Sequence, residues 1–153
     1  MTSKVGVGID VSKDKVDVAV TDGSLSGTGL QTPEELEELA RRLLELPVHR
    51  LLVEATGGYE RALLRVLHAH GLPVVLIEPK RARYFAKGLG RKAKTDPIDA
   101  AFLARMALIG IEDLPLWKPR DRPVAELRGL VQRRQQLLDS IGMDQRRLRT
   151  AEP

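Results

Sequence analysis

The chain has no cysteine among its 153 residues, which excludes disulfide bonds, thiolate zinc sites and cysteine nucleophiles. Aromatic residues make up only 3%, so leucine, valine, isoleucine and alanine must fill the core. The sequence has no run of about eighteen apolar residues that would predict a membrane span, and its N-terminus lacks the features of a signal peptide. It also lacks a Gly-x-x-x-x-Gly-Lys loop, which argues against a P-loop nucleotide enzyme. We therefore expect a soluble, cytoplasmic protein with no membrane partner.

Basic residues are unevenly distributed along the chain. The formal net charge is +4, yet the stretch from Pro79 to Thr95 holds seven bases and no acid. The seven are Lys80, Arg81, Arg83, Lys87, Arg91, Lys92 and Lys94. Such a stretch is typical either of a solvated surface loop or of a surface that binds a polyanion. Its position directly before Asp96 favours the polyanion, and we predict that these residues bind nucleic acid.

Hydrophobic periodicity predicts a strand meander followed by strands and helices in alternation. The expected strands cover residues 5–11, 15–22, 25–31, 49–55 and 72–79, and the expected helices cover 33–46, 57–71, 79–88 and 96–108. Thr32, Pro33 and Glu35 form a capping box at the start of the first helix. This order of elements predicts an α/β, ribonuclease-H-like fold, in which helices flank a mixed sheet.

The character of the sequence changes near residue 117. We expect a globular domain over residues 1–116, and over 117–153 a linker and the start of an arginine-rich, coiled-coil-like helix. Residues 120–149 contain eight arginines and four acids, with apolar residues close to helical spacing. Such a helix has no core of its own and needs a partner, either a second copy or further sequence. The C-terminus has the look of a truncation.

Four acidic residues lie where metal-binding carboxylates would be useful. Asp10 and Glu54 each end an apolar run, and the carboxyl ends of strands are where open α/β sheets place their ligands. Asp96 and Asp99 open a helix-like segment, and their spacing places both on one helix face. Converging carboxylates are held together by a hard cation, which predicts a site for Mg²⁺, with Mn²⁺ as a substitute.

Each acid also has a purely structural interpretation. Asp10 can be a turn residue, and Glu54 can cap the helix that follows a Gly57-Gly58 turn. Asp96 as N-cap and Asp99 in the first turn would favour their helix without any metal. Taken singly, each acid suits the structural role better. Taken together, on elements that a ribonuclease-H-like fold brings side by side, they favour the metal site.

At these residues the chain resembles the N-terminal domain of the insertion-sequence-110 family of transposases, also called DEDD transposases, to which the Piv-type invertases are related. The matching stretches include GIDVSKDKVDVAV, VEATGGYERALLRVL, KTDPIDAAFLARMA and LRGLVQRRQQLL. The resemblance implies a RuvC-like catalytic domain. Its four catalytic and metal-binding acids fall on Asp10, Glu54, Asp96 and Asp99.

The resemblance further implies a Mg²⁺-dependent recombinase that cuts and rejoins DNA under the guidance of a structured RNA. It also implies a C-terminal domain with a serine nucleophile, which this chain does not reach. We expect a nucleoid-associated bacterial protein that forms a homodimer or higher oligomer through its C-terminal helix. Two alternatives stay open: a non-catalytic module for nucleic-acid binding and dimerisation, and a sugar-kinase-like ATPase, which also begins with a strand ending in Gly-x-Asp.

Overall fold

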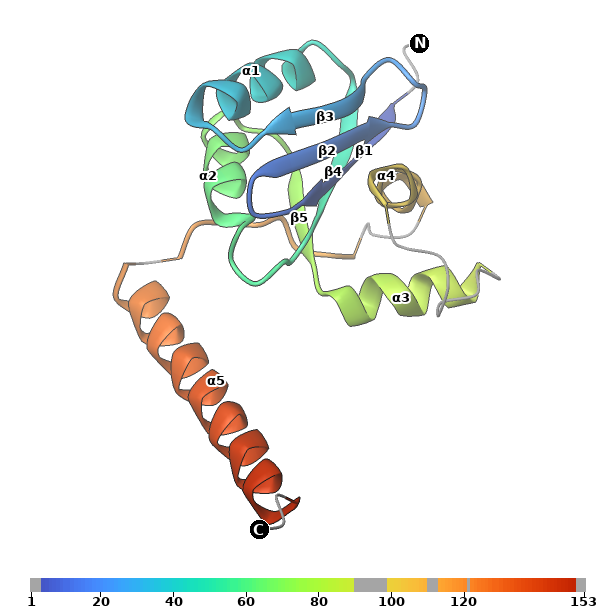
Figure 1. Cartoon of the computed structure of the whole chain (residues 1–153). Coiled ribbons are helices and arrows are strands. Elements are labelled where there is room, and N and C mark those ends of the chain that lie inside the picture. The colour runs from blue at the N-terminus through green and yellow to red at the C-terminus, as the bar shows by residue number, and fades with distance from the viewer. Residues whose placement is uncertain (1–3, 90–98, 110–112, 121, 151–153) are drawn as a thin grey trace. The chain divides into compact units, whose positions relative to one another are not determined.

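The computed structural model describes residues 4–89, 99–109, 113–120 and 122–150. The chain divides into two compact units, Met1–Lys118 and Pro119–Pro153 (Figure 1). Within the described residues, no helix combines the length and the apolar character that crossing a membrane requires.

The first unit is built on one five-stranded sheet with the order β3-β2-β1-β4-β5. The strands are β1 (Val5–Val11), β2 (Lys15–Val20), β3 (Ser26–Leu30), β4 (Val48–Glu54) and β5 (Val74–Ile77). The first three form an antiparallel meander, and β4 and β5 run parallel to β1. This mixed sheet and its flanking helices confirm the predicted ribonuclease-H-like architecture.

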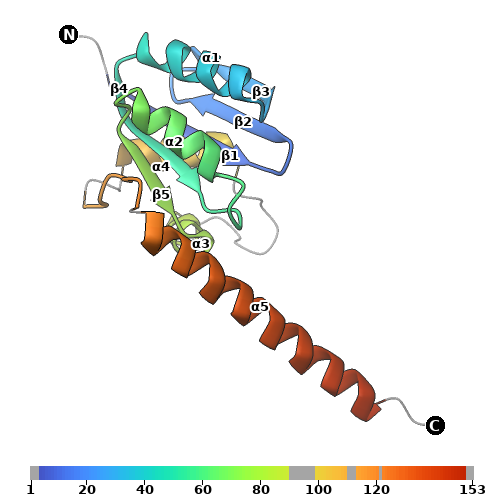
Figure 2. The same cartoon turned by 90° about the vertical axis from the view of Figure 1, so that its left-hand side faces the viewer.

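Four helices accompany the sheet. They are α1 (Pro33–Leu44), α2 (Arg61–Ala69), α3 (Pro79–Gly88) and α4 (Ala100–Ile109). Helices α1 and α2 lie on one face of the sheet, and α4 lies on the other (Figure 2). The predicted cap of α1 is present, because the Thr32 hydroxyl accepts the Glu35 N–H at 3.3 Å. Helix α1 therefore begins where the capping signal in the sequence predicts.

Strand β1 is buried on both faces, and its two faces carry different residues. Val5, Val7 and Ile9 point into the large core beneath α1 and α2. The alternate positions, Gly6 and Gly8, face α4 instead. Because side chains alternate along a strand, Asp10 lies on the α4 face as well. The sequence Gly-x-Gly-x-Asp thus gives one row of residues facing α4.

The two glycines let α4 lie directly against the backbone of β1. A Cβ added to Gly8 would meet the Ala100 carbonyl oxygen at 2.0 Å and the Ala104 nitrogen at 2.2 Å. A Cβ on Gly6 would meet the Ala104 oxygen at 2.3 Å. Helix α4 contributes small residues to this contact, since Ala100 and Ala104 are both buried. Backbone-to-backbone packing of this kind draws the start of α4 toward the end of β1.

Two helix starts differ from the sequence prediction. The predicted helix from Asp96 places Asp99 within its first turn, but α4 begins at Ala100 and Asp99 precedes it. The Asp99 carboxylate accepts the Phe102 N–H at 2.7 Å, so Asp99 is itself the cap. Helix α2 begins at Arg61 rather than at residue 57, because Gly57 and Gly58 adopt φ angles of 73° and 114° that a helix cannot contain.

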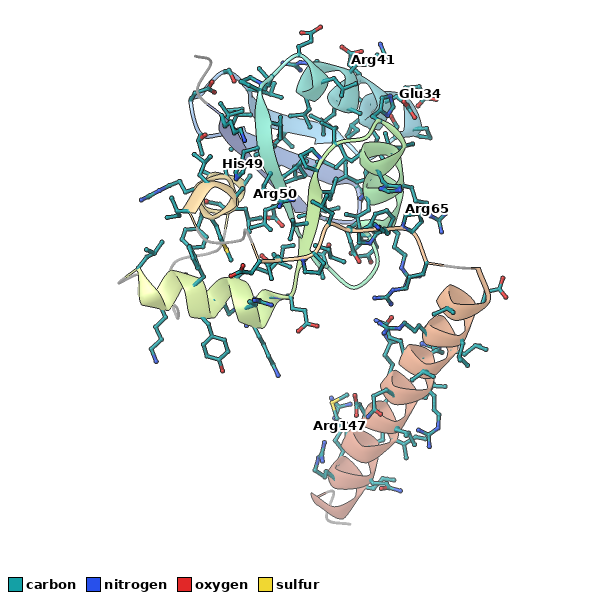
Figure 3. All side chains as sticks on the ribbon, turned by 180° about the vertical axis from the view of Figure 1, so that it is seen from behind. Glu34, Arg41, His49, Arg50, Arg65 and Arg147 are labelled. Carbon is teal, nitrogen blue, oxygen red and sulfur yellow. The ribbon has the colours of Figure 1, made fainter. Side chains whose placement is uncertain are left out.

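The second unit is dominated by α5 (Arg122–Thr150), a helix of 29 residues. Its large apolar side chains are exposed by 44% to 74%. They are Val124, Leu127, Leu130, Val131, Leu137, Leu138, Ile141, Met143 and Leu148. Charged residues interleave with them, as in the pair of Arg147 and Asp144 at 3.6 Å (Figure 3). The helix therefore carries an apolar surface that its own unit leaves uncovered.

Candidate metal centre and nucleic-acid interface

Asp10 and Glu54 lie at the carboxyl ends of two neighbouring parallel strands. The β1–β4 ladder pairs Gly8 with Leu52 and Ile9 with Val53, so the next residues along, Asp10 and Glu54, come side by side. Both carboxyls are half-buried. The alternation of each strand places both on the α4 face of the sheet. The sequence prediction of two acids at adjacent strand ends thus has a concrete geometry.

The electrostatics of the two carboxyls reflect this proximity. Burial raises the pKa of Asp10 above its ordinary value of 3.8, and repulsion from Asp17 and Asp99 raises it further. A hydrogen bond with the Val11 backbone works in the opposite direction on this pKa. Burial also raises the pKa of Glu54 above its ordinary value of 4.5, and repulsion from Asp10 adds to that effect. In both acids burial and neighbouring negative charge therefore outweigh the groups that stabilise the carboxylate, so its charge is only partly compensated.

The third predicted acid, Asp99, joins this group from α4. Its repulsion of Asp10 shows that the two carboxyls are close, even though they are far apart along the chain. The cap to the Phe102 N–H uses Oδ1 of Asp99, which fixes the carboxyl and leaves Oδ2 as a possible ligand atom. Capping and metal binding are thus compatible at this residue. The fourth predicted acid, Asp96, lies outside the described residues.

The donor set suits a hard divalent cation. All three described acids offer carboxylate oxygens, the ligands that Mg²⁺ and Mn²⁺ prefer. Among the described residues, however, no three acidic or histidine side chains stand close enough to form a ready metal cage. Like charges without a cation between them keep apart. The pKa values of Asp10 and Glu54 are raised mainly by burial, and repulsion between neighbouring acids adds to the effect.

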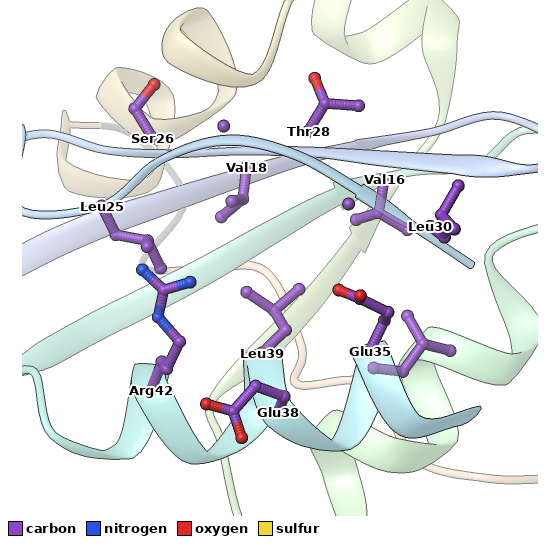
Figure 4. A pocket seen from close by; sticks show the side chains of 13 residues that line it. Val16, Val18, Leu25, Ser26, Thr28, Leu30, Glu35, Glu38, Leu39 and Arg42 are labelled. Atoms are coloured by element: carbon purple, nitrogen blue, oxygen red, sulfur yellow. The ribbon is translucent and has the colours of Figure 1, made fainter. Parts of the chain in front are cut away.

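Asp17 is a neighbour of the site that the sequence reading missed. The β1–β2 ladder pairs Asp10 directly with Asp17. Thr28, opposite Asp17 on β3, donates its hydroxyl hydrogen bond to the Asp17 carboxylate. Figure 4 shows the Thr28 side chain pointing away from α1, toward the face that carries Asp10. The only sequence signal was Asp17's place in an alternating strand, and its partner depends on register.

Glu60 was also missed, and it shapes the loop that follows Glu54. It is buried, with 6% of its surface exposed. One carboxylate oxygen accepts hydrogen bonds from the Thr56 N–H at 3.0 Å, the Gly58 N–H at 2.9 Å and the Thr56 hydroxyl at 3.3 Å. Glu60 therefore braces the glycine turn from inside. Glu54 does not cap α2, which begins seven residues later at Arg61, and its carboxyl stays at the strand end.

The described part of the basic stretch forms α3. Lys80, Arg81, Arg83 and Lys87 are all exposed on this helix. The Arg83 guanidinium lowers the pKa of Glu54, against the larger effect of burial, so Arg83 lies close to the acidic site. A cation beside the carboxylates is where a phosphate group would need a counter-charge. Arg91, Lys92 and Lys94 lie outside the described residues.

A cleft of about 130 Å³ lies elsewhere, between α1 and strands β2 and β3. Val16 and Val18 of β2 line it from the sheet, and Leu39, Glu35, Glu38 and Arg42 line it from α1 (Figure 4). These valines point to the α1 face of the sheet, whereas Asp10 lies on the α4 face. The cleft is therefore not part of the acidic site.

Three comparisons bear on the chain. The family model DEDD_Tnp_IS110, described as a transposase, matches residues 7–151. The pilin gene-inverting proteins of Moraxella lacunata and Moraxella bovis are each 30% identical over 142 residues, which cover 87% of this chain. The match spans 42% of the length of each relative. A solved structure of Thermus thermophilus RuvC in complex with a Holliday junction substrate aligns with 69% of this chain and 91% of its own, at 17% identity and a TM-score of 0.45.

Proposed function

The chain belongs to the DEDD_Tnp_IS110 family of transposases, whose model matches residues 7–151, and from this premise we propose that it is the metal-binding domain of a transposase or site-specific recombinase that cuts and rejoins DNA. The observation that supports the proposal is that Asp10 and Glu54 end neighbouring parallel strands on one face of the sheet, where Asp99 acts on the pKa of Asp10 and Arg83 on that of Glu54. The sugar-kinase-like alternative has no support in this family.

The residues of the site have distinct roles in this proposal. Asp10 and Glu54 supply carboxylate oxygens from two rigid strand ends, and Asp99 supplies one from the capped start of α4. Asp96 is the fourth acid of the set. When bound, Mg²⁺ supplies charge neutralisation at the scissile phosphate and at the attacking and leaving oxygens. Arg83 binds a phosphate oxygen of the same strand and holds it against the acids.

The partners follow from the charge of the chain and from its family. We propose DNA as substrate and a structured RNA as guide. Both would bind through the exposed lysine and arginine side chains of α3 and the basic residues after it. A second domain with a serine nucleophile would complete the active site in the full-length protein. The whole assembly would act in the cytoplasm, at the nucleoid.

Replacing Glu54 with glutamine tests the metal site. Glutamine keeps the size of the side chain but removes the charge, so we expect Mn²⁺ binding to weaken at least tenfold, as measured by the paramagnetic resonance of free Mn²⁺. Glu45→Gln is the matched control, because Glu45 is exposed at the end of α1, before β4 begins, whereas Glu54 lies at the opposite end of β4. We expect it to bind Mn²⁺ as the wild type does.

The same proteins distinguish the catalytic proposal from the non-catalytic alternative. If wild type and Glu54→Gln bound Mn²⁺ equally, and bound DNA and RNA equally with and without Mg²⁺, the metal-site proposal would be wrong. The chain would then be a nucleic-acid-binding and dimerisation module. If Glu54→Gln loses Mn²⁺ affinity while wild type and Glu45→Gln keep it, the result supports the proposal of a metal-dependent catalytic domain.

We also propose that α5 pairs with α5 of a second copy as a coiled coil. Val124, Leu127, Val131, Leu138, Ile141 and Leu148 fall on the seam positions of a coiled coil, at intervals of three, four, seven, three and seven residues, and Arg134 and Gln145 occupy the two seam positions between them. Burying this surface in a dimer removes apolar area that the described unit leaves in water.

An aspartate at Ile141 should separate the two copies. Burial of an isoleucine contributes roughly 1.5–3 kcal/mol, and the dimer loses it twice, so we expect its dissociation constant to rise on the order of 100-fold or more. Sedimentation equilibrium of the 153-residue chain measures this. Gln136→Asp introduces the same charge on the opposite side of the helix and should leave the dimer intact. A monomeric wild type at about 100 μM would contradict the pairing, because it would leave the dimer less than about 5.5 kcal/mol of association free energy.

A further inference from the structure

Helix α3 packs on the domain by one side only. Ala82 and Ala86 are buried, and Phe85 packs edge-on against Phe102 of α4 with ring centroids 6.3 Å apart. These contacts fix which face of α3 points away from the domain. Because residues three and four apart share a helix face, the outward face carries Lys80, Tyr84 and Lys87.

Tyr84 is the most prominent apolar group on this face. It is 72% exposed, more than the other exposed tyrosine, Tyr59, at 50%. Because the ring is mostly exposed to solvent, its burial contributes little to the stability of the fold. Lys80 lies one turn before it and Lys87 one turn after, and α3 contains no acid. The ring therefore stands between two cations on a helix that is complementary to a polyanion.

The combination of ring and cations discriminates between kinds of polyanion. A regular duplex presents phosphates to lysine and arginine but keeps its bases stacked on one another, so an exposed tyrosine adds little. An unpaired strand presents both phosphates and bare base faces, and aromatic side chains stack on those faces. The pattern on α3 fits the unpaired strand better than the duplex.

The outward face of α3 lies on the same helix as Arg83, which acts on the acidic site. Arg83 directly precedes Tyr84, and its charge acts on Glu54. A strand whose phosphate lies against Arg83 can therefore place a neighbouring base on the outward side of the same helix. Stacking there would hold the strand open beside the site where it is to be cut.

We propose that Tyr84 is a stacking platform for an unpaired base of a single-stranded nucleic acid, with Lys80 and Lys87 holding the adjacent phosphates. This inference rests on the proposed function, because it assigns the form of the nucleic acid that reaches the same site. DNA and RNA share the chemistry on which it depends, a stackable base and a charged backbone.

The test compares Tyr84→Ala with wild type by fluorescence anisotropy, using a labelled ten-nucleotide DNA, the RNA of the same sequence and the DNA duplex. Stacking contributes about 1–3 kcal/mol per base, so we expect Tyr84→Ala to weaken single-strand binding about 5- to 150-fold. Duplex binding should change less than about twofold. Tyr84→Phe should bind as the wild type does, because it keeps the ring. Whichever single strand loses more affinity is the one that the platform holds.

Salt dependence separates the ring from its flanking cations. Tyr84→Ala should leave the slope of log K against log salt unchanged, since the ring neutralises no phosphate. The double variant Lys80→Ala/Lys87→Ala should reduce that slope by about 1.4, which is roughly 0.7 for each single-strand phosphate released. Leu44→Ala removes an apolar side chain of α1 that is 51% exposed and should change neither affinity nor slope.

Several results would overturn the proposal. It is wrong if Tyr84→Ala weakens duplex and single strand equally, if Tyr84→Leu binds as tightly as Tyr84→Phe, or if the wild type binds no single strand. The free energy of unfolding of Tyr84→Ala should lie within about 0.5 kcal/mol of the wild-type value, as is usual for exposed substitutions. The variant should also bind Mn²⁺ as the wild type does. If Tyr84→Ala binds single strands as the wild type does, the stacking proposal is wrong but the metal-site proposal is unaffected. If Glu54→Gln binds Mn²⁺ as the wild type does, the metal-site proposal is wrong.

Discussion

Replacing Gly8 with alanine is expected to displace α4, destabilise the domain severely and abolish divalent-cation binding. The new methyl carbon would lie 2.0 Å from the Ala100 oxygen and 2.2 Å from the Ala104 nitrogen, both backbone atoms that no rotamer change can move. Overpacking of a core costs about 1–3 kcal/mol when side chains can adjust, so we expect roughly 3 kcal/mol or more here. The melting temperature should fall on the order of 10 °C.

The matched control for this variant is Gly29→Ala in β3. A Cβ there meets only Glu35 Oε2, at the ordinary contact distance of 3.5 Å, so stability should change little. We expect Gly8→Ala to lose the proposed cation binding because Asp99 precedes α4 and moves with it. A Gly8→Ala protein that melted like wild type and still bound Mn²⁺ would show that α4 does not set the position of Asp99.

Asp10→Asn should have two opposite effects on stability, depending on the cation. Without metal, we expect the variant to be more stable than wild type at neutral pH. With saturating Mg²⁺, we expect the order to reverse, because only wild type is stabilised by binding. At a free concentration of about 100 times its dissociation constant, a ligand stabilises the native state by about 2.7 kcal/mol.

The pH dependence of this effect has a definite sign. The pKa of Asp10 is raised in the folded protein, first by burial and then by its acidic neighbours, so the folded state binds the proton more tightly than the unfolded state does. Stability therefore falls as pH rises from the ordinary value of 3.8 through the raised folded value. Above that window the whole penalty applies. The asparagine side chain carries no such proton and should not show this loss.

Denaturant unfolding in EDTA between about pH 3.5 and 8 measures the difference between the two proteins. Asp14→Asn is the control, since Asp14 is an exposed acid in the turn after β1. It should keep the wild-type pH profile and the wild-type response to Mg²⁺. If Asp10→Asn proved less stable than wild type in EDTA at pH 8, the charge of Asp10 would be compensated by a partner that our account omits.

Local sequence signals predicted the fold because they coincide with packing in this chain. The alternation in Val5, Val7 and Ile9 predicted β1, and it is that alternation which buries these residues beneath α1 and α2. Thr32 predicted the start of α1 because its hydroxyl makes the capping bond within one turn. Signals of this kind need no knowledge of the rest of the chain.

Features that depend on distant partners were not predictable in the same way. Asp17 opposes Asp10 only because of the register between β1 and β2, and Glu60 braces its loop only because Gly57 and Gly58 turn the backbone over it. The sequence favours a helix start at Asp96 because Pro97 follows it, whereas Asp99, which caps α4, is followed by Ala100 and carries no such signal. The choice of Asp10, Glu54 and Asp99 as neighbours came from the predicted fold, while their roles as ligands stay a prediction.

The close contact between α4 and the two glycines of β1 also bears on when the acidic group assembles as the chain is synthesised. Residues 5–30 can form their meander as soon as they emerge, because its pairings are local. The pairing of β1 with β4 and the docking of α4 join segments distant in sequence and are expected to form later. Until α4 docks, Leu52, Val75 and Ile77 lack part of their cover, and Asp10 and Glu54 lack their third partner. Completion of this core and assembly of the acidic group are thus one event, so a partly folded chain cannot hold Asp10, Glu54 and Asp99 together.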